Sequence, residues 1–413
     1  MSFAYLFERF PSFSQTFCVR EVLGIRGLAG SVPVFSIRRP TGEPEQNYPA
    51  AAQENVTNLP DDIEAALRTE KVPLGARLQR WRWLRKLAKE KDRRRAFEAL
   101  WLGPQLLEAG VTHVHAHFAG IAARTAWWLK SFYGIHYSFT AHANDIFVEN
   151  KDAILPLNDL VRDAAFVVAV SDFSRDWLCR RTPGFDEKIH RIYNGIDLEG
   201  FPHAAPAPGA PRIVTVGRYI EKKGFADLID ACAILQKRGR AFDCAIIGCG
   251  PLEEPLQARI NALALNDCVH LTGPRSQAEV LNSLAAATLF VLPCATEPDG
   301  GMDTLPTVIV EAMAASLPVI STRLAAIPEM VEDGSTGLLV DEKSVEPLAQ
   351  AMQKILDDPA LAASMGAAGR LLAAERFDIR IVAAQLLEHL TKHGATALVP
   401  PGNRPRFSGR TAR

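Results

Sequence analysis

Residues Pro293–Ser316 read P-C-A-T-E-P-D-G-G-M-D-T-L-P-T-V-I-V-E-A-M-A-A-S. They join an apolar run, Thr288–Leu292, which we expect to form a strand, to a run that we expect to form a helix. The loop between them contains Gly300 and Gly301, and Pro306 stands where a first-turn proline costs the helix no hydrogen bond. The stretch therefore predicts a strand, a glycine-containing loop and a helix, which is a unit of an α/β fold.

The start of this expected helix has the groups that a phosphorylated ligand needs. The N–H groups of the first turn of a helix have no partner within the helix. Those of Thr307 and Val308 can therefore bind a phosphate at the positive end of this helix. Asp303 before the helix and Glu311 within it offer carboxylates to sugar or ribose hydroxyls. Acid-rich loops before helices also act as simple caps. This stretch alone does not decide between the two interpretations.

The composition is that of an ordinary globular enzyme. A chain of 413 residues is too long for one ordinary core, so two domains are expected. Hydrophobic residues make up 48% of the chain and charged residues 23%, both common values for globular proteins. The net charge of −1 gives no argument for a nucleic-acid partner, and we expect none.

The cysteines and the N-terminus indicate a cytoplasmic protein. The seven cysteines are scattered without a C-x-x-C pair, which indicates neither a zinc cage nor a disulfide framework, and reduced thiols fit a cytosol. The opening M-S-F-A-Y-L-F-E-R-F has too short an apolar run for a signal peptide. No apolar run approaches the roughly 20 residues of a membrane-spanning helix.

Short apolar runs alternate with longer helical patterns, which is typical of parallel sheets wrapped in helices. In the first half we expect strands at Ala4–Phe7, Val32–Ser36, Thr112–His115, Tyr137–Thr140, Phe166–Val170 and Ile189–Tyr193. In the second half we expect them at Arg212–Val216, Asp243–Ile247, Val269–Leu271, Thr288–Leu292, Val319–Ser321 and Leu338–Val340.

A stretch rich in Pro and Ala separates the two series. It reads F-P-H-A-A-P-A-P-G-A-P at 201–211 and predicts an interdomain linker. We therefore expect two doubly wound, Rossmann-like α/β domains, 1–200 and 212–376, that face each other across a cleft. Ligands should lie in that cleft, at the carboxyl ends of the strands. The basic, Pro/Gly-rich residues 394–413 are expected to form a disordered tail.

Arg77–Arg95 contains ten basic and two acidic residues. As a helix it would place Trp81, Leu84 and Leu87 beside the basic face, an arrangement that suits the surface of an anionic membrane. The alternative is a solvated helix whose apolar residues pack on the domain. Both interpretations stay open.

The loop after the first expected strand reads F-P-S-F-S-Q-T-F and leads into a helix near Gln15. At the edge of the cleft it would offer Ser14 and Thr16 to a ligand on the acceptor side. Ser14 acting only as a helix cap is the alternative.

Five polar residues follow or line two expected strands of the first half. His113, His115 and His117 alternate, so a strand places them on one face, and His117 is the one best placed to face the cleft. Imidazoles suit zinc, but no cysteine or acidic pair nearby completes a ligand set, and we expect no metal. His142 and Asp145, in F-T-A-H-A-N-D-I-F, are placed for a polar substrate; a structural His–Asp pair is the alternative.

The second half opens with I-V-T-V-G-R-Y-I-E-K-K-G-F, in which Arg218 and Lys223 bracket a short loop. Two cations around such a loop can clamp a diphosphate. The later segment G-C-G-P-L-E fails as a dinucleotide fingerprint because Glu253 stands at the third glycine position. Gly248 and Gly250 instead predict a tight turn that lets the backbone approach a nucleotide.

Several motifs in the same order closely resemble family 4 of the retaining glycosyltransferases, which have the GT-B fold. They are V-G-R-Y-I-E-K-K-G, I-I-G-C-G-P-L, D-x7-E with E-A-M-A, and Y-N-G-I-D. The segments F-P-S-F-S-Q-T-F-x3-E, H-A-H-F and T-A-H-A-N-D-I-F look like the branch that builds exopolysaccharides of the colanic acid type. The resemblance covers roughly residues 3 to 392.

The resemblance implies roles for individual residues. Arg218 and Lys223 match the basic pair that holds the donor diphosphate, and Glu311 matches the second acid of the family's E-x7-E motif, which binds the ribose. His142 and Asp145 match first-domain residues near the donor sugar and the acceptor.

Asp303 matches the first acid of that motif, which contacts the transferred sugar. The family usually has Glu at this position, and the Asp side chain here is one methylene shorter. This difference bears most directly on which sugar the donor carries. The neighbouring loop is rich in acid and glycine, so Asp299, Gly300 and Gly301 are further candidates for sugar contacts.

The resemblance implies transfer of a sugar from a UDP- or GDP-sugar to an acceptor hydroxyl, with retention at the anomeric carbon and without a metal or other cofactor. It also implies a lipid-linked oligosaccharide acceptor, held at the inner face of the cytoplasmic membrane. The family's final helix crosses back to the first domain, which 377–393 would do here. A sugar-nucleotide epimerase of the same architecture and a non-catalytic sugar-nucleotide-binding protein remain alternatives.

Overall fold

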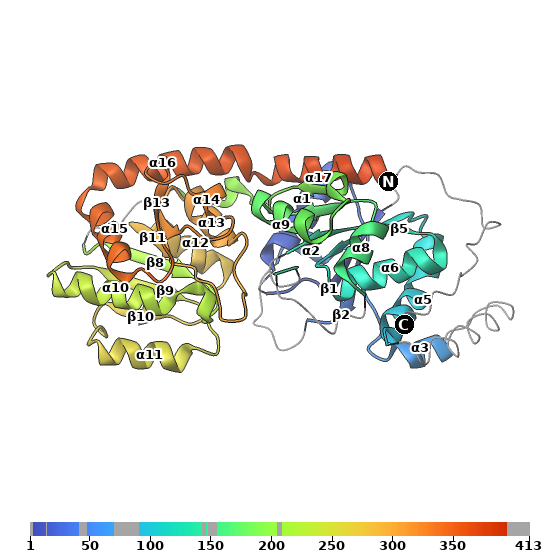
Figure 1. Ribbon diagram of the computed structural model, residues 1–413, viewed down its shortest axis with the longest axis horizontal. Helices are drawn as coiled ribbons and strands as arrows, with labels where there is room; N and C mark the ends of the chain where they lie inside the picture. The colour runs from blue at the N-terminus through green and yellow to red at the C-terminus, as the bar shows by residue number, and fades with distance from the viewer. Residues whose placement is uncertain are drawn as a thin grey trace.

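The structure is a computed structural model, and it describes residues 3–13, 15–40, 48–69, 91–142, 146–147, 155–204 and 209–394. Figure 1 shows two α/β lobes side by side, with the last helices running along both. The first lobe contains the first half of the chain, and the second lobe contains most of the second half.

The first lobe is built on a seven-stranded parallel sheet of order β3-β2-β1-β4-β5-β6-β7. Its strands are β1 (Phe3–Arg9), β2 (Val34–Arg38), β3 (Val56–Asn58), β4 (His113–His117), β5 (His136–Ala141), β6 (Val167–Ala169) and β7 (Ile189–Arg191). β3 is absent from the strands expected from sequence. It is three residues long, lies at the sheet edge and is not fully buried, so no apolar run marks it.

The second lobe is built on a six-stranded parallel sheet of order β10-β9-β8-β11-β12-β13. Its strands are β8 (Arg212–Val216), β9 (Asp243–Ile247), β10 (Val269–Leu271), β11 (Leu289–Leu292), β12 (Val319–Thr322) and β13 (Gly337–Val340). The bounds of β8, β9 and β10 are those expected from sequence. Short, largely apolar runs are typical of the strands of a parallel sheet, which explains this agreement.

Helices cover both faces of the sheets. In the first lobe they are α1 (Thr16–Ala29), α2 (Ala50–Gln53), α3 (Ile63–Thr69), α5 (Arg93–Glu108), α6 (Ile121–Tyr133), α8 (Leu157–Asp163) and α9 (Asp172–Arg181). In the second half they are α10 (Phe225–Lys237), α11 (Glu253–Ala262), α12 (Gln277–Ala285), α13 (Thr307–Ala314), α14 (Ile327–Met330), α15 (Val345–Asp357), α16 (Pro359–Arg376) and α17 (Ile379–Gly394).

Strand β1 shows how the first sheet is covered. Its alternating side chains point to opposite faces. Tyr5 and Phe7 join a buried cluster with residues of α1, whereas Ala4 and Leu6 join a second cluster with residues of α5 and α6. The first lobe is therefore doubly wound, as expected.

The last helix crosses back to the first lobe, where α17 packs against α1 (Figure 1). The Ile196 N–H donates to the Phe377 carbonyl and the Ile379 N–H donates to the Ile196 carbonyl, both at 2.8 Å. These bonds fix the chain just before α17, which begins at Ile379 rather than at residue 377. A Cβ at Gly195 would lie 2.8 Å from the Ile379 Cα, so the lack of a side chain at this position makes the close approach possible.

Several expectations fall on residues outside the described part of the chain: Ser14, Asp145, 77–90, 205–208 and 395–413. Of the basic segment Arg77–Arg95, the structure describes only residues 91–95, the last three of which open α5. Among the described helices, none has both the length and the apolar character needed to cross a membrane.

Candidate active site

A cleft of about 550 Å³ is lined by residues of both lobes. The first lobe contributes the start of α1 and residues that follow β4 and β5, and the second lobe contributes the loops after β8 and β9 and the start of α13. These segments follow the carboxyl ends of parallel strands, where ligands of doubly wound folds bind. Of the residues expected to form the site, those that line the cleft are Thr16, His142, Arg218, Lys223, Gly248, Asp303, Thr307, Val308 and Glu311.

The N-terminus of α13 opens into this cleft. The helix begins at Thr307, Pro306 takes the N-cap position instead of the first turn, and no side chain caps the helix. The first amides of a helix have no intrahelical partner, so those of Thr307 and Val308 can bind an anion. Beside them, the buried Thr304 hydroxyl also lines the cleft and has no hydrogen bond to any described residue.

Asp303 lies between two lysines of the loop after β8. Its Oδ2 is 2.5 Å from the Lys223 Nζ, and its Oδ1 is 3.5 Å from the Lys222 Nζ. Burial disfavours the charged carboxylate, but the two ammonium groups outweigh burial and hold the pKa of Asp303 below its ordinary value. Burial likewise opposes the charge on Lys223, but Asp303 outweighs it and raises the pKa of that lysine. Asp303 and Lys223 are therefore both charged at neutral pH.

Lys222 was not among the residues expected from sequence. The Lys-Lys pair shows two cations, but sequence alone does not indicate that both reach the cleft. Arg218 is exposed at the cleft, and none of the ion pairs within the described residues involves it. Its guanidinium is therefore available to an anion.

Glu311 joins the two lobes. Its Oε1 lies 2.9 Å from the Arg20 Nη2, and both side chains are largely buried. Arg20 belongs to α1 and was not expected at the site, because a single arginine within a helix carries no sequence signal for a partner so far along the chain.

His142 lies at the cleft wall between two aromatic rings, those of Phe17 at 4.8 Å and Phe118 at 4.4 Å between ring centres. Burial, followed by the neighbouring His117 and His115, holds the pKa of His142 well below its ordinary value. The imidazole is therefore neutral.

His117 does not line the cleft, contrary to expectation, because it is fully buried behind His142. Its Nδ1 is 3.3 Å from the His142 Nε2, and its Nε2 is 2.9 Å from the Glu21 Oε1. Burial disfavours the charge on Glu21, but His117 outweighs it and lowers the pKa of the carboxyl. The alternation along β4 correctly predicted the face of the strand on which His117 lies, but not how deeply its side chain is buried. Nothing in the sequence indicated that Glu21 would be its hydrogen-bond partner.

Glu21, His115 and His117 have ligand atoms within 4.8 Å of one another, which is close enough to hold one ion. Hydrogen bonds already engage these histidines: the His115 ring nitrogens lie 2.8 Å from the Ser138 Oγ and 3.0 Å from the Thr140 Oγ1. A hydrogen-bonded buried cluster accounts for these contacts. The expectation of a site without metal stays a prediction.

Of the remaining candidate residues, Asp299, Gly300, Gly301 and Gly250 lie outside the cleft lining, whereas Gly248 belongs to it. The Gly301 N–H donates to the Asp299 Oδ1 at 2.8 Å, so Asp299, Gly300 and Gly301 form their own turn. Gly248 has φ +151°, and a Cβ there would lie 1.9 Å from the Gly217 carbonyl oxygen. Gly250 similarly packs on the Tyr219 backbone. The close approach that these two glycines permit is therefore to the loop after β8.

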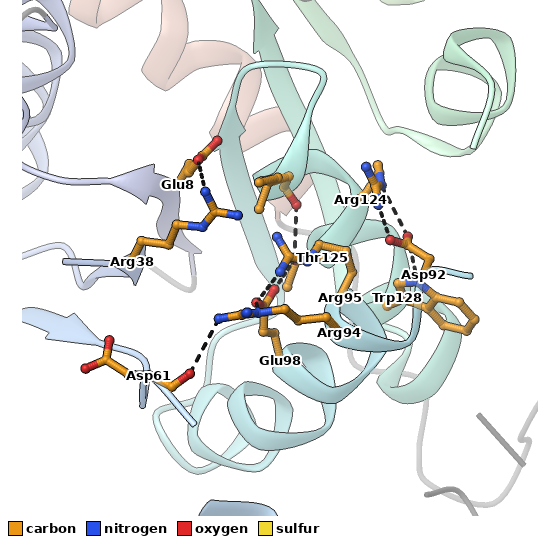
Figure 2. A network of polar contacts seen from close by, with 11 residues as sticks. Glu8, Arg38, Asp61, Asp92, Arg94, Arg95, Glu98, Arg124, Thr125 and Trp128 are labelled. Carbon is orange, nitrogen blue, oxygen red and sulfur yellow. Dashed lines mark hydrogen bonds and ion pairs between the residues drawn. The ribbon is translucent and has the colours of Figure 1, made fainter. Parts of the chain in front are cut away.

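A polar network links the start of α5 to α6 (Figure 2). Arg95 is buried and its Nη2 is 2.6 Å from the Glu98 Oε1, while the Thr125 hydroxyl donates to the Glu98 Oε2 at 3.0 Å. Asp92 binds Arg124 and accepts from the Trp128 Nε1 at 3.2 Å. These bonds tie the first turns of α5 and α6 together, so the described end of the basic segment packs against the protein.

Both lobes match known protein families. Residues 46–199 match Glycosyltransferase Family 4, and residues 201–372 match Glycosyl transferases group 1. The chain is 40% identical over 165 residues to the putative colanic acid biosynthesis glycosyltransferase WcaL of Salmonella typhimurium, covering 40% of this chain and 41% of that protein. It is 37% identical over 208 residues to the amylovoran biosynthesis glycosyltransferase AmsK of Erwinia amylovora, covering 50% and 51%. The chain thus spans about half the length of these relatives or less.

A longer match is to the alpha-maltose-1-phosphate synthase of Mycolicibacterium smegmatis, at 31% identity over 70% of this chain and 80% of that protein. Solved structures agree with the fold. A glycosyltransferase from Rickettsia africae has a TM-score of 0.72 at 15% identity, over 96% of this chain and 99% of its own. Anabaena HepE, solved in complex with UDP, has a TM-score of 0.71 at 18% identity, over 95% and 100%. The expected GT-B fold is confirmed.

Proposed function

Because this chain belongs to the GT-B glycosyltransferases of family 4, we propose that it transfers a sugar from a nucleoside diphosphate to an acceptor hydroxyl. The observation that carries the proposal is the cleft itself, in which an uncapped helix N-terminus, a cluster of cations and a buried carboxylate lie together.

The charges of the cleft suit a diphosphate. Arg218, Lys222 and Lys223 bring three positive charges to the cleft. Of its two carboxylates, Asp303 faces the lysines and Glu311 is already paired with Arg20. The first amides of α13 add donors directed at the same space. When the bond to the sugar breaks, negative charge develops on the leaving diphosphate, and preformed cations and amides stabilise that charge most effectively. No metal is needed for this role.

The donor is proposed to be a UDP- or GDP-sugar. HepE was solved with UDP and with UDP-glucose, which supports the nucleotide class. Glu311 would accept hydrogen bonds from the ribose hydroxyls, and Asp303 and His142 would face the transferred sugar. We also propose retention at the anomeric carbon, on the strength of the family resemblance.

The acceptor is proposed to enter from the first lobe, past Thr16 and His142. The names of WcaL and AmsK refer to the biosynthesis of colanic acid and amylovoran, which supports an exopolysaccharide intermediate as acceptor. A lipid-linked oligosaccharide would bring the protein to the cytoplasmic face of a membrane, where the basic residues of Arg77–Arg95 other than the buried Arg95 would contact anionic lipids.

A thermal-shift screen against UDP, GDP and dTDP and their common sugar conjugates tests the proposal. One nucleoside diphosphate should raise the melting temperature, and its conjugates should then be incubated with extracted lipid-linked acceptors. An elongated acceptor is the expected product. An isomerised sugar nucleotide would instead identify an epimerase, and the absence of any stabilising nucleotide would contradict the proposal.

A further inference from the structure

We propose that Arg20 of the first lobe is a positioning residue that holds Glu311 ready for the nucleotide ribose. Donor affinity would then depend on a contact between the two lobes. This inference rests on the proposed function, because it assigns a partner to a carboxylate of that same site.

The contact is a buried ion pair at the cleft wall. The Arg20 Nη2 lies 2.9 Å from the Glu311 Oε1, and the two side chains are 13% and 6% exposed. Arg20 lies one turn after Thr16 and Phe17, which line the cleft from α1, and Glu311 lines it from α13. The pair therefore connects the helices that open on the two sides of the cleft.

The Glu311 carboxylate has no other ion pair or hydrogen bond among the described residues, so Arg20 alone compensates its charge. Removing one partner of a buried ion pair is strongly disfavoured, because the other charge is left without compensation. Arg20 thus holds the Glu311 carboxylate in place at the cleft wall.

Arg20 also has a donor to spare. Its Nη1 is buried and has no hydrogen bond to any described residue. The Phe201 ring, 6.0 Å from the Arg20 Cζ, offers no strong acceptor. Arg20 is not among the residues that line the cleft, so it acts on the ribose through Glu311.

The test compares ribose with a sugar that lacks its hydroxyls. Isothermal titration calorimetry would measure the Kd of the nucleoside diphosphate that stabilises the wild type, UDP or GDP, and of its 2′,3′-dideoxy form. Arg20→Met should weaken binding of the ribose form about tenfold or more, because hydrogen bonds to charged groups are strong. Binding of the dideoxy form should change less than about twofold.

Further variants complete the design. Arg20→Lys keeps the positive charge but loses the planar guanidinium. Its Kd for the ribose form should lie between those of the wild type and Arg20→Met. Adding Arg20→Met to Glu311→Gln should weaken ribose binding little further. The matched control is Arg380→Met, which removes another Arg–Glu pair at 2.9 Å whose side chains are 66% and 78% exposed, and it should leave Kd unchanged.

Equal weakening of the ribose and dideoxy forms, or no weakening of either, would overturn the assignment. If Arg20→Met does not fold, the same comparison with Arg20→Lys decides. A wild type that binds no nucleoside diphosphate contradicts the proposed function instead, so the two failures are distinguishable.

Discussion

The Lys223 ammonium lies 2.5 Å from the Asp303 carboxylate, and both side chains are largely buried beside the start of α13. This contact joins the cation expected to hold the diphosphate to the acid expected to contact the sugar. The two expected roles are thus electrostatically coupled, and changing one residue should affect both.

Asp303→Asn should separate the two roles. Loss of the counter-charge leaves Lys222 and Lys223 unopposed, so the free nucleoside diphosphate should bind several-fold more tightly. Transfer should fall about tenfold or more, because the sugar loses a charged hydrogen-bond acceptor. Calorimetry and a radiolabelled transfer assay measure the two effects. Weaker nucleotide binding together with unchanged transfer would show that Asp303 has neither role.

Asp303→Glu is the matched conservative change, since it keeps the charge and adds one methylene. We expect nucleotide affinity close to that of the wild type and an altered ratio of transfer rates between donor sugars. A screen of sugar conjugates of the preferred nucleotide measures that ratio. An unchanged ratio would mean that residue 303 does not influence which donor sugar is transferred.

The buried histidines of β4 predict that stability falls in acid. Burial lowers the pKa of both His113 and His115 to about 3. In the unfolded chain histidine titrates near 6.5, so between these values the unfolded state binds more protons than the folded state. The contribution of these two histidines to the free energy of unfolding is fully present above about pH 6.5 and is lost as the pH falls toward 3.

Glu98 acts in the opposite direction, because burial raises its pKa to about 7 and its contribution is lost as the pH rises through that value. The pKa shifts of His113 and His115 are each larger than that of Glu98, so the two histidines outweigh its effect on stability. The melting temperature should therefore fall as the pH is lowered from about 7 to about 5. His113→Gln should flatten this dependence, and differential scanning calorimetry across this range measures it. Identical slopes for variant and wild type would contradict the explanation.

Gly195→Ala should destabilise the junction before α17. A Cβ at this position would lie 2.8 Å from the Ile379 Cα, so the loop after β7 or the helix must move. We expect a loss of about 1–3 kcal/mol in the free energy of unfolding, measured by urea denaturation. Gly27→Ala is the control, since nothing lies within 4 Å of a Cβ there. Equal stability of the two variants would count against the close approach.

Membrane contact through the basic segment is tested by charge reversal. Changing Arg82, Arg85 and Lys86 to Glu should weaken co-sedimentation with anionic vesicles by about two orders of magnitude or more, because each basic residue contributes about 1 kcal/mol. Neutral vesicles serve as control. Unchanged co-sedimentation with anionic vesicles would leave the segment as a solvated or packed helix.

Sequence reasoning predicted the sheets and much of the cleft because both depend on local patterns. Apolar runs mark β8, β9 and β10, and parallel strands bring their carboxyl ends to one edge, which gathers Arg218, Lys223 and Glu311. The contacts made by α1 were not predictable in this way. Arg20 and Glu21 meet Glu311 and His117 only after the chain has folded, and no spacing in the sequence encodes such pairs.

The sequence also did not predict how deeply a side chain is buried or which way it points. Alternation placed His117 on the correct face of β4 but could not show that His142 covers it. The acid and glycines of the loop before α13 suggested sugar contacts, whereas the Asp299 carboxylate accepts from its own turn. Both differences come from side-chain packing, which a one-dimensional pattern does not specify.

The central claim is that the cations of this cleft hold a donor diphosphate during sugar transfer. The most direct measurement is the transfer rate, from a labelled sugar nucleotide to extracted lipid-linked acceptors, of Arg218→Ala and Lys223→Ala. Lys237→Ala on the exposed end of α10 serves as control. Rates at least about 100-fold below wild type for both cleft variants, with unchanged circular dichroism and an unaffected control, are predicted. Wild-type rates in both cleft variants would contradict the claim.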